Sequence, residues 1–267
     1  MRNVSNKPVT QKNAGSTGEL DLYAASRLKR LFDEMSATYG VVNYISSFGF
    51  THRWRRQCVD LAELRPGDRV CDLMTGMGEC WDEIFRRTRE PDAATSAGKT
   101  PALVAIDFSP VMIAAARKKA AAHAEFAHVE VLEQDVFQYT VAPAERFDAI
   151  VCGFGVKTLA PEMYADVADL LLRLLKPGGR FAFVEISLPP SPFLRVPLML
   201  YLKLMIPWIG KFCLGNPDNY RMLGVYTAAF QNSERLHQTL LDRGLHARYH
   251  RLFFGSATVV SGATPAP

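Results

Sequence analysis

Residues 70–81, Val-Cys-Asp-Leu-Met-Thr-Gly-Met-Gly-Glu-Cys-Trp, constrain the fold of this chain more than any other segment. A short apolar run reaches the acidic Asp72 and passes into a loop with glycines at 76 and 78. Glycine lets a backbone turn sharply and approach a ligand closely. Many nucleotide-binding α/β folds hold a cofactor at this point, at the carboxyl end of the first strand. The segment therefore predicts a parallel sheet that binds a nucleoside cofactor.

Strand-like and helix-like segments alternate along the rest of the chain. The pattern predicts a helix over 109–123, because Ser109 suits the N-cap and Pro110 the first helical position. The alternation predicts an α/β fold with a doubly wound, mostly parallel sheet. The expected strands are 69–74, 102–107, 128–133, 147–152, 180–187 and two within 246–261, and the other expected helices are 19–38, 50–63, 79–89, 161–175 (stopped by Pro177-Gly178-Gly179) and 233–243.

One domain accounts for most of the chain. With 48% hydrophobic and 22% charged residues, the composition supports a buried core. We expect residues 1–18, which are polar and aperiodic, to be disordered, and residues 19–262 to form the domain. Residues 263–267 should be a frayed tail. Residues 91–100 have the composition of a loop.

Charge and cysteine content exclude several classes of protein. The net charge is +4 without a basic block, so we expect no nucleic-acid partner. The five cysteines (58, 71, 80, 152 and 213) show no metal-type spacing, which favours reduced thiols in a cytoplasmic protein. The opening residues lack the apolar core of a secretory signal. No run reaches the roughly 18–20 apolar residues of a membrane span.

Acidic residues at two further strand ends extend the predicted site. Asp107 ends the second strand, where a carboxylate can accept hydrogen bonds from both hydroxyls of a ribose. The alternative for Asp107 is an acid stabilised by the dipole of the following helix. Gln134-Asp135 ends the third strand, where a base could be recognised, and a simple turn is the alternative. No Gly-Lys-Ser/Thr follows the glycine loop, so a P-loop is not supported.

The order of these motifs resembles the class I S-adenosylmethionine (SAM) methyltransferases, a Rossmann-like fold. More narrowly it resembles the ubiquinone/menaquinone C-methyltransferases, over about residues 25–260. The motifs that carry the general resemblance are Val70-Cys-Asp-Leu, Gly76-x-Gly78, Ala105-Ile-Asp107, Gln134-Asp135, Phe147-Asp-Ala-Ile and Leu175-Lys-Pro-Gly-Gly-Arg180. Those that carry the narrower one include Phe32–Tyr39, Asn43, Ser47–Gly49, Trp54–Arg56, Phe154–Val156 and Asp218–Arg221.

The resemblance implies a cofactor site and a helical N-terminal lid. It places Gly76, Met77 and Gly78 around the methionine part of SAM, with Asp72 and Met74 at the start of the same loop. Asp107 would hold the ribose and Asp135 with Val136 the adenine. Gly153 would form the floor near the sulfonium, and Tyr39 would close over the cofactor from the lid. The implied substrate-binding residues are Phe154, Tyr220 and Arg221.

Several residues depart from the family pattern. Met74 stands where the loop has a small residue, and Met77 replaces a hydroxyl-bearing one. The family's Phe-Gly-Leu-Arg-Asn becomes Phe154-Gly-Val-Lys157-Thr158. This combination resembles the rhodoquinone-biosynthesis (RquA-type) branch. That resemblance implies conversion of ubiquinone to rhodoquinone by replacement of a ring methoxy with the amino group of SAM, with a divalent metal such as Mn²⁺.

The expected mechanism therefore has two versions. Amination requires a polarised quinone carbonyl, and Tyr39, Lys157 or a metal would polarise it. The alternative is C-methylation of a quinol or related aromatic, which requires a deprotonated phenol aligned with the SAM methyl group. Glu79, with Asp82 and Glu83, could assist a metal or the amino group, or be solvated acids at a helix start. A third hypothesis is a non-catalytic SAM-fold protein that binds quinone.

Residues 189–215 form an apolar insertion with three cations (Arg195, Lys203 and Lys211) and no acid. Pro197 and Pro207 should break it, so a spanning helix is not expected. Its Trp and Tyr residues suit the headgroup boundary of a bilayer. Because a polyisoprenoid quinone lies in the membrane, we expect peripheral contact with the inner face of the cytoplasmic membrane. The alternative is a buried cap over the substrate pocket.

Overall fold

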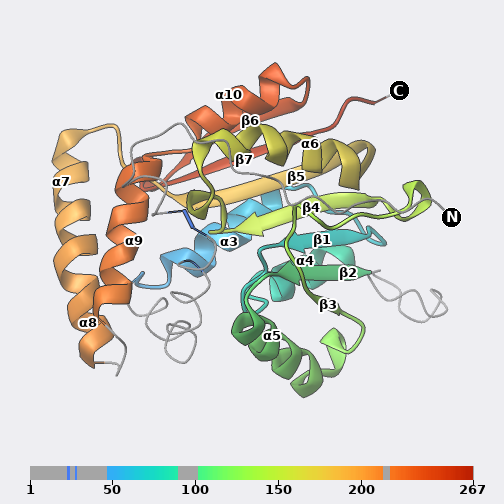
Figure 1. Cartoon of the computed structure of the whole chain (residues 1–267), viewed down its shortest axis with the longest axis horizontal. Coiled ribbons are helices and arrows are strands. Elements are labelled where there is room, and N and C mark those ends of the chain that lie inside the picture. The colour runs from blue at the N-terminus through green and yellow to red at the C-terminus, as the bar shows by residue number, and fades with distance from the viewer. Residues whose placement is uncertain (1–22, 25–27, 29–46, 90–101, 213–216, 267) are drawn as a thin grey trace, which may run out of the picture.

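A single seven-stranded sheet organises the chain in the computed structural model (Figure 1). The structure describes residues 23–24, 28, 47–89, 102–212 and 217–266. The strand order is β3-β2-β1-β4-β5-β7-β6. Six strands run in the same direction, and β7, between β5 and β6, runs in the opposite one. The strands are β1 (Val70–Leu73), β2 (Leu103–Asp107), β3 (Glu130–Glu133), β4 (Phe147–Gly153), β5 (Leu175–Ile186), β6 (His246–Leu252) and β7 (Ala257–Ala263). The predicted doubly wound, mostly parallel sheet is confirmed.

Helices cover both faces of this sheet. Alternate residues of β1, β2, β4 and β5 point to opposite faces and are buried on both, as the period of a strand requires. One face packs against α6 and α10, at the top of Figure 1, and the other against α3, α4 and α5. The helices are α3 (Phe50–Leu61), α4 (Trp81–Thr88), α5 (Pro110–Ala122), α6 (Tyr164–Leu174), α7 (Pro192–Leu200), α8 (Ile206–Phe212), α9 (Pro217–Phe230) and α10 (Glu234–Asp242).

Most element boundaries lie within a few residues of those predicted. Ser109 caps α5 as expected, because its Oγ accepts a hydrogen bond from the Met112 N–H at 3.3 Å. The helix predicted over 161–175 begins as a 3₁₀ turn, becomes α6 at Tyr164, and ends at Leu174. The Pro-Gly-Gly segment bulges out of β5, which joins β4 at Leu175 and again from Arg180. The helix predicted over 19–38 and the loop predicted over 91–100 fall largely or wholly outside the described residues.

The prediction that prolines break the 189–215 insertion is wrong. Helix α7 continues through Pro197, a π-helical turn covers Tyr201–Met205, and α8 follows without interruption. Pro207 is the second residue of α8, directly after the π turn. A π turn is a common device for absorbing such irregularity within a helix. Among the described helices, none has the length and hydropathy that a bilayer-spanning segment requires.

The C-terminus is held more firmly than predicted. Ala263 ends β7, and the buried Thr264 donates from its N–H to the Gly179 carbonyl at 2.9 Å and from Oγ1 to the Lys176 carbonyl at 2.8 Å. The frayed tail expected over 263–267 is therefore wrong for its first three residues. Ala263 pairs with Arg180 of β5, and the backbones of Thr264 and Pro265 bond those of Gly179 and Gly178. The prediction of disorder for residues 1–18 falls outside the described residues.

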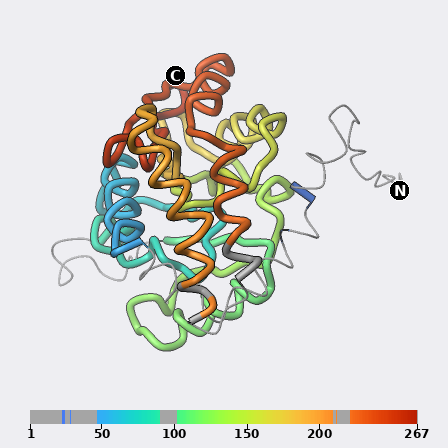
Figure 2. The backbone as a smooth tube through the Cα atoms, turned by 90° about the vertical axis from the view of Figure 1, so that its left-hand side faces the viewer, coloured from blue at the N-terminus to red at the C-terminus, as the bar shows by residue number. Residues whose placement is uncertain are grey.

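A helical cap lies beyond the carboxyl ends of the parallel strands. In Figures 1 and 2, α7 and α8 run side by side with α9 at this end of the sheet. We call the continuous helix over residues 192–212 the α7–α8 rod. Its Leu202 and Ile206 are buried against Tyr226 of α9 and Leu28. Phe108, which follows β2, is packed against the same cluster. The cap is thereby joined to the edge of the sheet.

Candidate cofactor and active site

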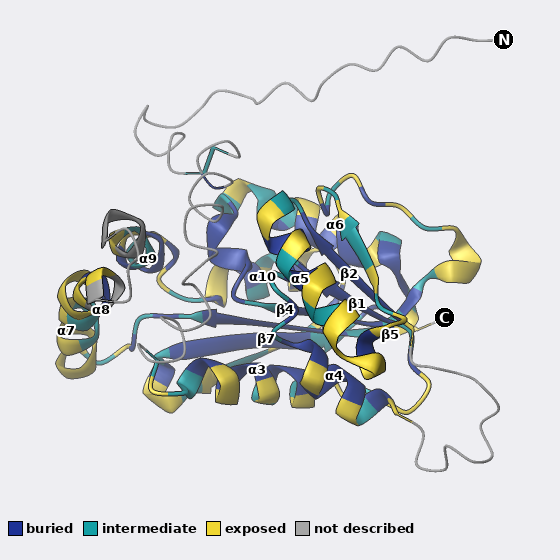
Figure 3. Cartoon of the chain, turned by 90° about the horizontal axis from the view of Figure 1, so that it is seen from below, coloured by how far each residue is buried: buried dark blue, intermediate teal, exposed yellow. Residues whose placement is uncertain are grey.

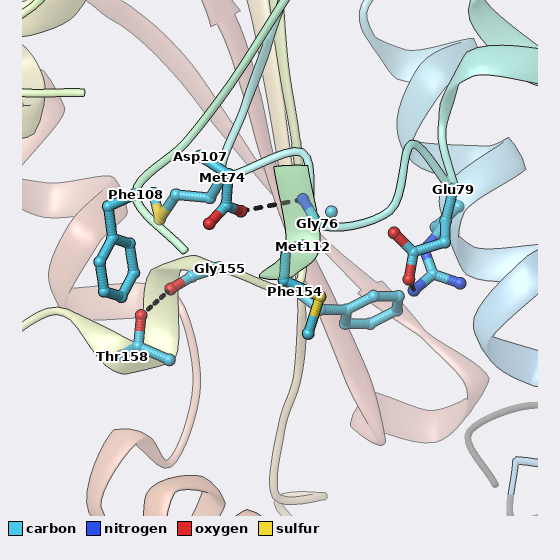
Figure 4. A pocket seen from close by; sticks show the side chains of 11 residues that line it. Met74, Gly76, Glu79, Asp107, Phe108, Met112, Phe154, Gly155 and Thr158 are labelled. Carbon is cyan, nitrogen blue, oxygen red and sulfur yellow. Dashed lines mark hydrogen bonds and ion pairs between the residues drawn. The ribbon is translucent and has the colours of Figure 1, made fainter. Parts of the chain in front are cut away.

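A pocket of about 480 Å³ opens where the chain leaves β1, β2 and β4 (Figure 4). Strands β2 and β4 flank β1 on opposite sides, so the pocket lies where the strand order reverses. This switch point is the usual ligand site of doubly wound folds. The lining residues are Arg55, Met74, Gly76, Glu79, Asp107, Phe108, Met112, Gly153, Phe154, Gly155 and Thr158.

Asp107 joins the glycine loop to the start of α5. Its Oδ2 accepts a hydrogen bond from the Gly76 N–H and its Oδ1 one from the Ser109 N–H, both at 2.9 Å. Burial raises the pKa of the Asp107 carboxyl above its usual value, and the backbone donors oppose that rise. Each oxygen keeps a lone pair for a further donor. The carboxylate therefore fixes the loop and still faces the pocket (Figure 4).

The two loop glycines are needed for different reasons. Gly76 (φ +59°) and Gly78 (φ +83°) both adopt left-handed backbone that favours glycine. A Cβ on Gly76 would lie 2.8 Å from Glu79 Oε2, beside the pocket. A Cβ on Gly78 would lie 2.6 Å from the Trp81 ring, on the core side. Gly76 thus shapes the pocket directly, whereas Gly78 allows the loop to pack on α4.

Asp72 supports the loop from beneath. The Trp81 indole N–H donates to Thr75 Oγ1 at 3.0 Å, and Thr75 Oγ1 donates to Asp72 Oδ2 at 2.6 Å. Asp72 is 1% exposed, and burial raises its pKa from 3.8 to about 7. Its Oδ1 is buried and accepts no hydrogen bond from the described residues. Asp72 does not line the pocket.

Glu79 and Arg55 form one wall of the pocket. Glu79 Oε2 accepts from the Met77 N–H at 2.9 Å, and Oε1 accepts from the buried Arg55 guanidinium at 3.3 Å. The Arg55 guanidinium also lies 5.0 Å from the centre of the Phe154 ring. Glu79 precedes α4, so it belongs to the loop and not, as predicted, to the helix. Of the other two acids, Asp82 is exposed, but Glu83 is buried between Arg86 and Arg87 and is not solvated.

Met74 occupies the opposite part of the pocket. Its backbone φ is +54°, a left-handed value that a small residue or glycine adopts with less strain. Its side chain lies against Gly155, which has no Cβ to obstruct it. Phe154 shares this unusual backbone, with φ +68° at the end of β4. Two strained residues thus face each other across the site, as often occurs at functional positions.

Lys157 does not line the pocket, although its Nζ lies 5.8 Å from the centre of the Phe154 ring, which does. Its Nζ donates to Glu185 Oε1 at 2.6 Å and its backbone N–H to Glu185 Oε2 at 3.1 Å. The Ile186 N–H also donates to Glu185 Oε1 at 2.9 Å. Both charged side chains are buried. The predicted carbonyl-polarising lysine is therefore neutralised by a carboxylate 28 residues further along the chain.

The pocket brings together Met74, Gly76, Glu79, Asp107, Gly153 and Phe154 among the predicted residues. Asp135 is exposed and accepts a hydrogen bond from the Phe137 N–H at 3.0 Å, which is the turn alternative. Val136 is buried in the core cluster beneath α6. Arg221 is exposed on α9, where Tyr220 also lies. Tyr39 falls outside the described residues.

Sequence reasoning assigned no role to five residues of the pocket: Arg55, Phe108, Met112, Gly155 and Thr158. Arg55 lies within the Trp54–Arg56 motif, so a signal was present without a role. Phe108 and Met112 flank the start of α5, next to Asp107, and supply an aromatic ring and a thioether. Thr158 donates from Oγ1 to the Gly155 carbonyl at 2.6 Å. In the described part of the chain, no group of three or more His, Cys, Asp or Glu side chains is arranged to hold a metal ion.

Comparison with known proteins gives consistent matches. The profile of the ubiE/COQ5 methyltransferase family matches residues 22–264. A demethylmenaquinone methyltransferase from Thermus thermophilus is 33% identical over 235 residues, which cover 88% of this chain and 100% of that protein. The ubiquinone/menaquinone biosynthesis C-methyltransferase UbiE of Ectopseudomonas mendocina is 27% identical, with 90% of each chain covered.

Solved structures support the fold. The crystal structure of a SAM-dependent methyltransferase from Aquifex aeolicus aligns with a TM-score of 0.51 at 17% identity, covering 78% of this chain and 88% of that one. A putative methyltransferase from Haloferax volcanii, in complex with its Trm112 activator, aligns with a TM-score of 0.53 at 15% identity, over 88% and 97% of the two chains.

Proposed function

The chain belongs to the ubiE/COQ5 methyltransferase family, and on that premise we propose that it transfers a methyl group from SAM to a ring carbon of a quinone precursor. The observation that carries the proposal is the pocket at the switch point of the sheet, where Asp107 holds the glycine loop. The substrate class is taken from the relatives, whose names refer to demethylmenaquinone and to ubiquinone/menaquinone biosynthesis.

The residues of the pocket fit SAM. The Asp107 carboxylate offers lone pairs for ribose hydroxyls, and Phe108 with Met112 offers an apolar surface to an adenine. Glu79 places negative charge where a cationic α-amino group would be stabilised. Gly76 leaves open a space that a Cβ would narrow.

SAM supplies an electrophilic methyl group when it is bound. The chain contributes orientation, because the wall of Met74, Phe154 and Gly155 restricts how a planar ring can enter. C-methylation also needs an electron-rich ring, and a phenolate is more electron-rich than a phenol. The Arg55 guanidinium is the pocket cation that favours a phenolate oxygen, with its charge partly balanced by Glu79.

Rhodoquinone formation by amino transfer is a second candidate. The observation that favours it is the Met74 side chain, which narrows the pocket beside Gly155 where the family carries a small residue. The relatives named above carry methyltransferase names, so they support methyl transfer and not amination. A metal-assisted version of the reaction has no support from the described side chains.

One experiment separates the two reactions. The protein is expressed in two hosts, one that makes ubiquinone, in which amination can be detected, and one that lacks its own quinone C-methyltransferase, in which methylation can be detected. The quinones are then extracted after feeding methionine labelled with heavy carbon in the methyl group and heavy nitrogen in the amino group. Heavy carbon in a newly methylated quinone supports methyl transfer. Heavy nitrogen in a quinone that has lost a methoxy group would overturn methyl transfer in favour of amination.

A binding measurement tests the third hypothesis, a non-catalytic quinone-binding protein. Calorimetric titration of the purified protein with SAM should give saturable binding that Asp107→Ala removes. Absence of saturable binding to the wild type would refute both enzymatic proposals and leave the fold without its cofactor.

A further inference from the structure

The α7–α8 rod exposes an apolar face to solvent. Phe193 is 90% exposed and Trp208 is 65% exposed, and between them lie Val196, Leu200 and Leu204, each more than half exposed. Their spacing of three or four residues places them along one side of a helix. In Figure 3 this rod stands at the end of the molecule and is largely exposed.

The opposite side of the rod is also apolar, and it is already occupied. Leu202 and Ile206 are buried in the cap cluster with Tyr226. An apolar helix face is normally covered by another part of the protein or by a partner. Here the described chain covers only one side of the rod. Exposed apolar patches of this kind usually mark sites that bind another protein or a membrane.

Two turns continue the apolar surface beside the rod. Phe253 and Phe254 are 52% and 74% exposed on the β6–β7 turn, whose Gly255 packs against Pro190 at the entry to α7. Phe48 is 79% exposed at the start of α3, and its ring centre lies 6.1 Å from that of Tyr201 in the π turn. Figure 2 looks onto this end of the molecule, with the rod in orange, the start of α3 in blue and the β6–β7 turn in dark red.

The backbone presents these aromatic rings at a cost. Phe48, Phe253 and Phe254 have φ values of +50°, +42° and +55°. Bulky residues seldom adopt this left-handed region, because it brings the side chain close to the backbone. Phe253 packs against the Phe50 ring with centres 4.4 Å apart, but Phe48, Phe253 and Phe254 all stay more than half exposed. Strained backbone of this kind persists where the surrounding structure imposes it, often at ligand clamps.

The charge of the rod indicates which kind of partner would bind its exposed apolar side. Residues 192–212 contain Arg195, Lys203 and Lys211 and no acid. In a symmetric pair of copies the same patch would face itself and bring these cations together without compensation. An anionic headgroup layer over a hydrocarbon interior complements both the cations and the apolar side chains.

We propose that this surface, formed by Phe48, the exposed side of 193–208 and Phe253–Phe254, docks the protein onto an anionic lipid bilayer. The rod lies in the plane of the interface, with Trp208 at headgroup depth. Because Phe108 lines the pocket and packs against the cap cluster, the cap connects the docking surface to the site. The proposal concerns docking alone and does not depend on which group the pocket transfers.

Flotation of the full-length protein with lipid vesicles tests the proposal. Vesicles of phosphatidylcholine alone are compared with vesicles that also contain phosphatidylglycerol. We expect binding to the anionic vesicles at least about tenfold tighter than to the neutral ones, and weakened by salt. The Phe193→Ser, Leu204→Ser double variant should bind at least about tenfold more weakly. The matched control is Leu172→Ser, Leu241→Ser, which changes exposed leucines of α6 and α10 and should bind as wild type.

Tryptophan fluorescence gives a second readout. Trp208 is exposed, whereas the other two tryptophans, Trp54 and Trp81, are buried. Its emission should shift to the blue on binding and be quenched by lipids brominated near the headgroup. Failure of the wild type to float with anionic vesicles, or equal binding by the Phe193→Ser, Leu204→Ser variant, would overturn the proposal. A dimer in light scattering that this variant dissociates would assign the surface to a second copy instead.

Discussion

Met74 and Gly155 fit each other so closely that a Cβ on Gly155 would lie 2.7 Å from Met74 Sδ and 2.8 Å from Met74 Cβ. Met74 and the glycine opposite it therefore form one tightly packed contact. An unusual residue in the cofactor loop is accommodated by a glycine 81 positions later in the chain.

The pairing predicts a specific rescue. Gly155→Ala should lower the free energy of unfolding by about 1–3 kcal/mol, because it overpacks this contact. Met74→Gly in the same protein should recover part of that loss, because it removes both the Sδ and the Cβ of Met74, whereas Cys152 Sγ stays 3.0 Å from the added Cβ. Urea unfolding of the two single variants and the double variant measures the coupling energy. Purely additive effects would contradict the contact.

Met74 also predicts a change in reaction. Met74→Gly removes a strained left-handed side chain and a partly buried contact, so stability should change by less than about 2 kcal/mol. The pocket becomes wider beside Gly155, and turnover of the native substrate should fall. Steady-state kinetics with a thermal melt as control checks this. Unchanged turnover in a folded variant would mean that Met74 does not set the fit of the substrate.

Asp107 should carry much of the cofactor affinity. Asp107→Asn keeps the size of the side chain but replaces one acceptor oxygen with a donor that opposes the Gly76 or Ser109 N–H. We expect SAM to bind about 10- to 100-fold more weakly, in line with the loss of hydrogen bonds to a charged group. Calorimetry measures this, with Asp166→Asn on the exposed face of α6 as the matched control. Equal weakening in the control would point to a general charge effect.

Asp72 predicts a pH dependence of stability. Because burial raises its pKa from 3.8 to about 7, the folded protein favours the neutral carboxyl more than the unfolded chain does. The stabilising contribution is therefore complete below the unfolded pKa and is lost as the pH rises through about 7. Compared with Asp72→Asn, which stays neutral, the wild type should lose unfolding free energy between about pH 4 and pH 7. A constant difference between the two proteins across this range would show that Asp72 does not titrate as described.

The Lys157–Glu185 pair separates a structural from a catalytic role. Glu185→Gln should cost about 3–5 kcal/mol of stability, because it leaves a buried lysine without its counter-charge. The double change Lys157→Met, Glu185→Gln should be much more stable than the single one. Turnover by this double variant then decides the role of the lysine: activity close to wild type makes the pair structural. A folded but inactive double variant would restore Lys157 as a functional group.

The sequence was a good guide to the sheet and to one side of the site. Apolar runs that are buried on both faces predicted the parallel strands, and the residues that end β1, β2 and β4 then had to meet at one edge. That argument was sufficient to predict that Gly76, Asp107 and Gly153 lie at one pocket. It could not distinguish Asp135, since a strand-ending acid that closes its own turn has the same sequence pattern as one that faces a ligand.

Long-range pairings were beyond the sequence. Lys157 is neutralised by Glu185, and Arg55 reaches the pocket from a helix that precedes β1, but no local pattern links either residue to its partner. Pro197 was misjudged because a proline rule describes an average helix, whereas the cap cluster packs this one from the side. Thr264 was misjudged because its partners lie 85 and 88 residues earlier in the chain.

The position of β7 has a consequence for how the protein is made. Strand β6 is synthesised before β7, yet it joins the sheet only through β7, which lies between β5 and β6. The edge of β5 that pairs with β7 therefore stays unpaired while α7 to α10 and β6 are synthesised. Exposed strand edges and late non-local pairing slow folding and invite aggregation. A chain interrupted before residue 257 would leave both β5 and β6 without their shared neighbour, so production of the protein depends on its last strand.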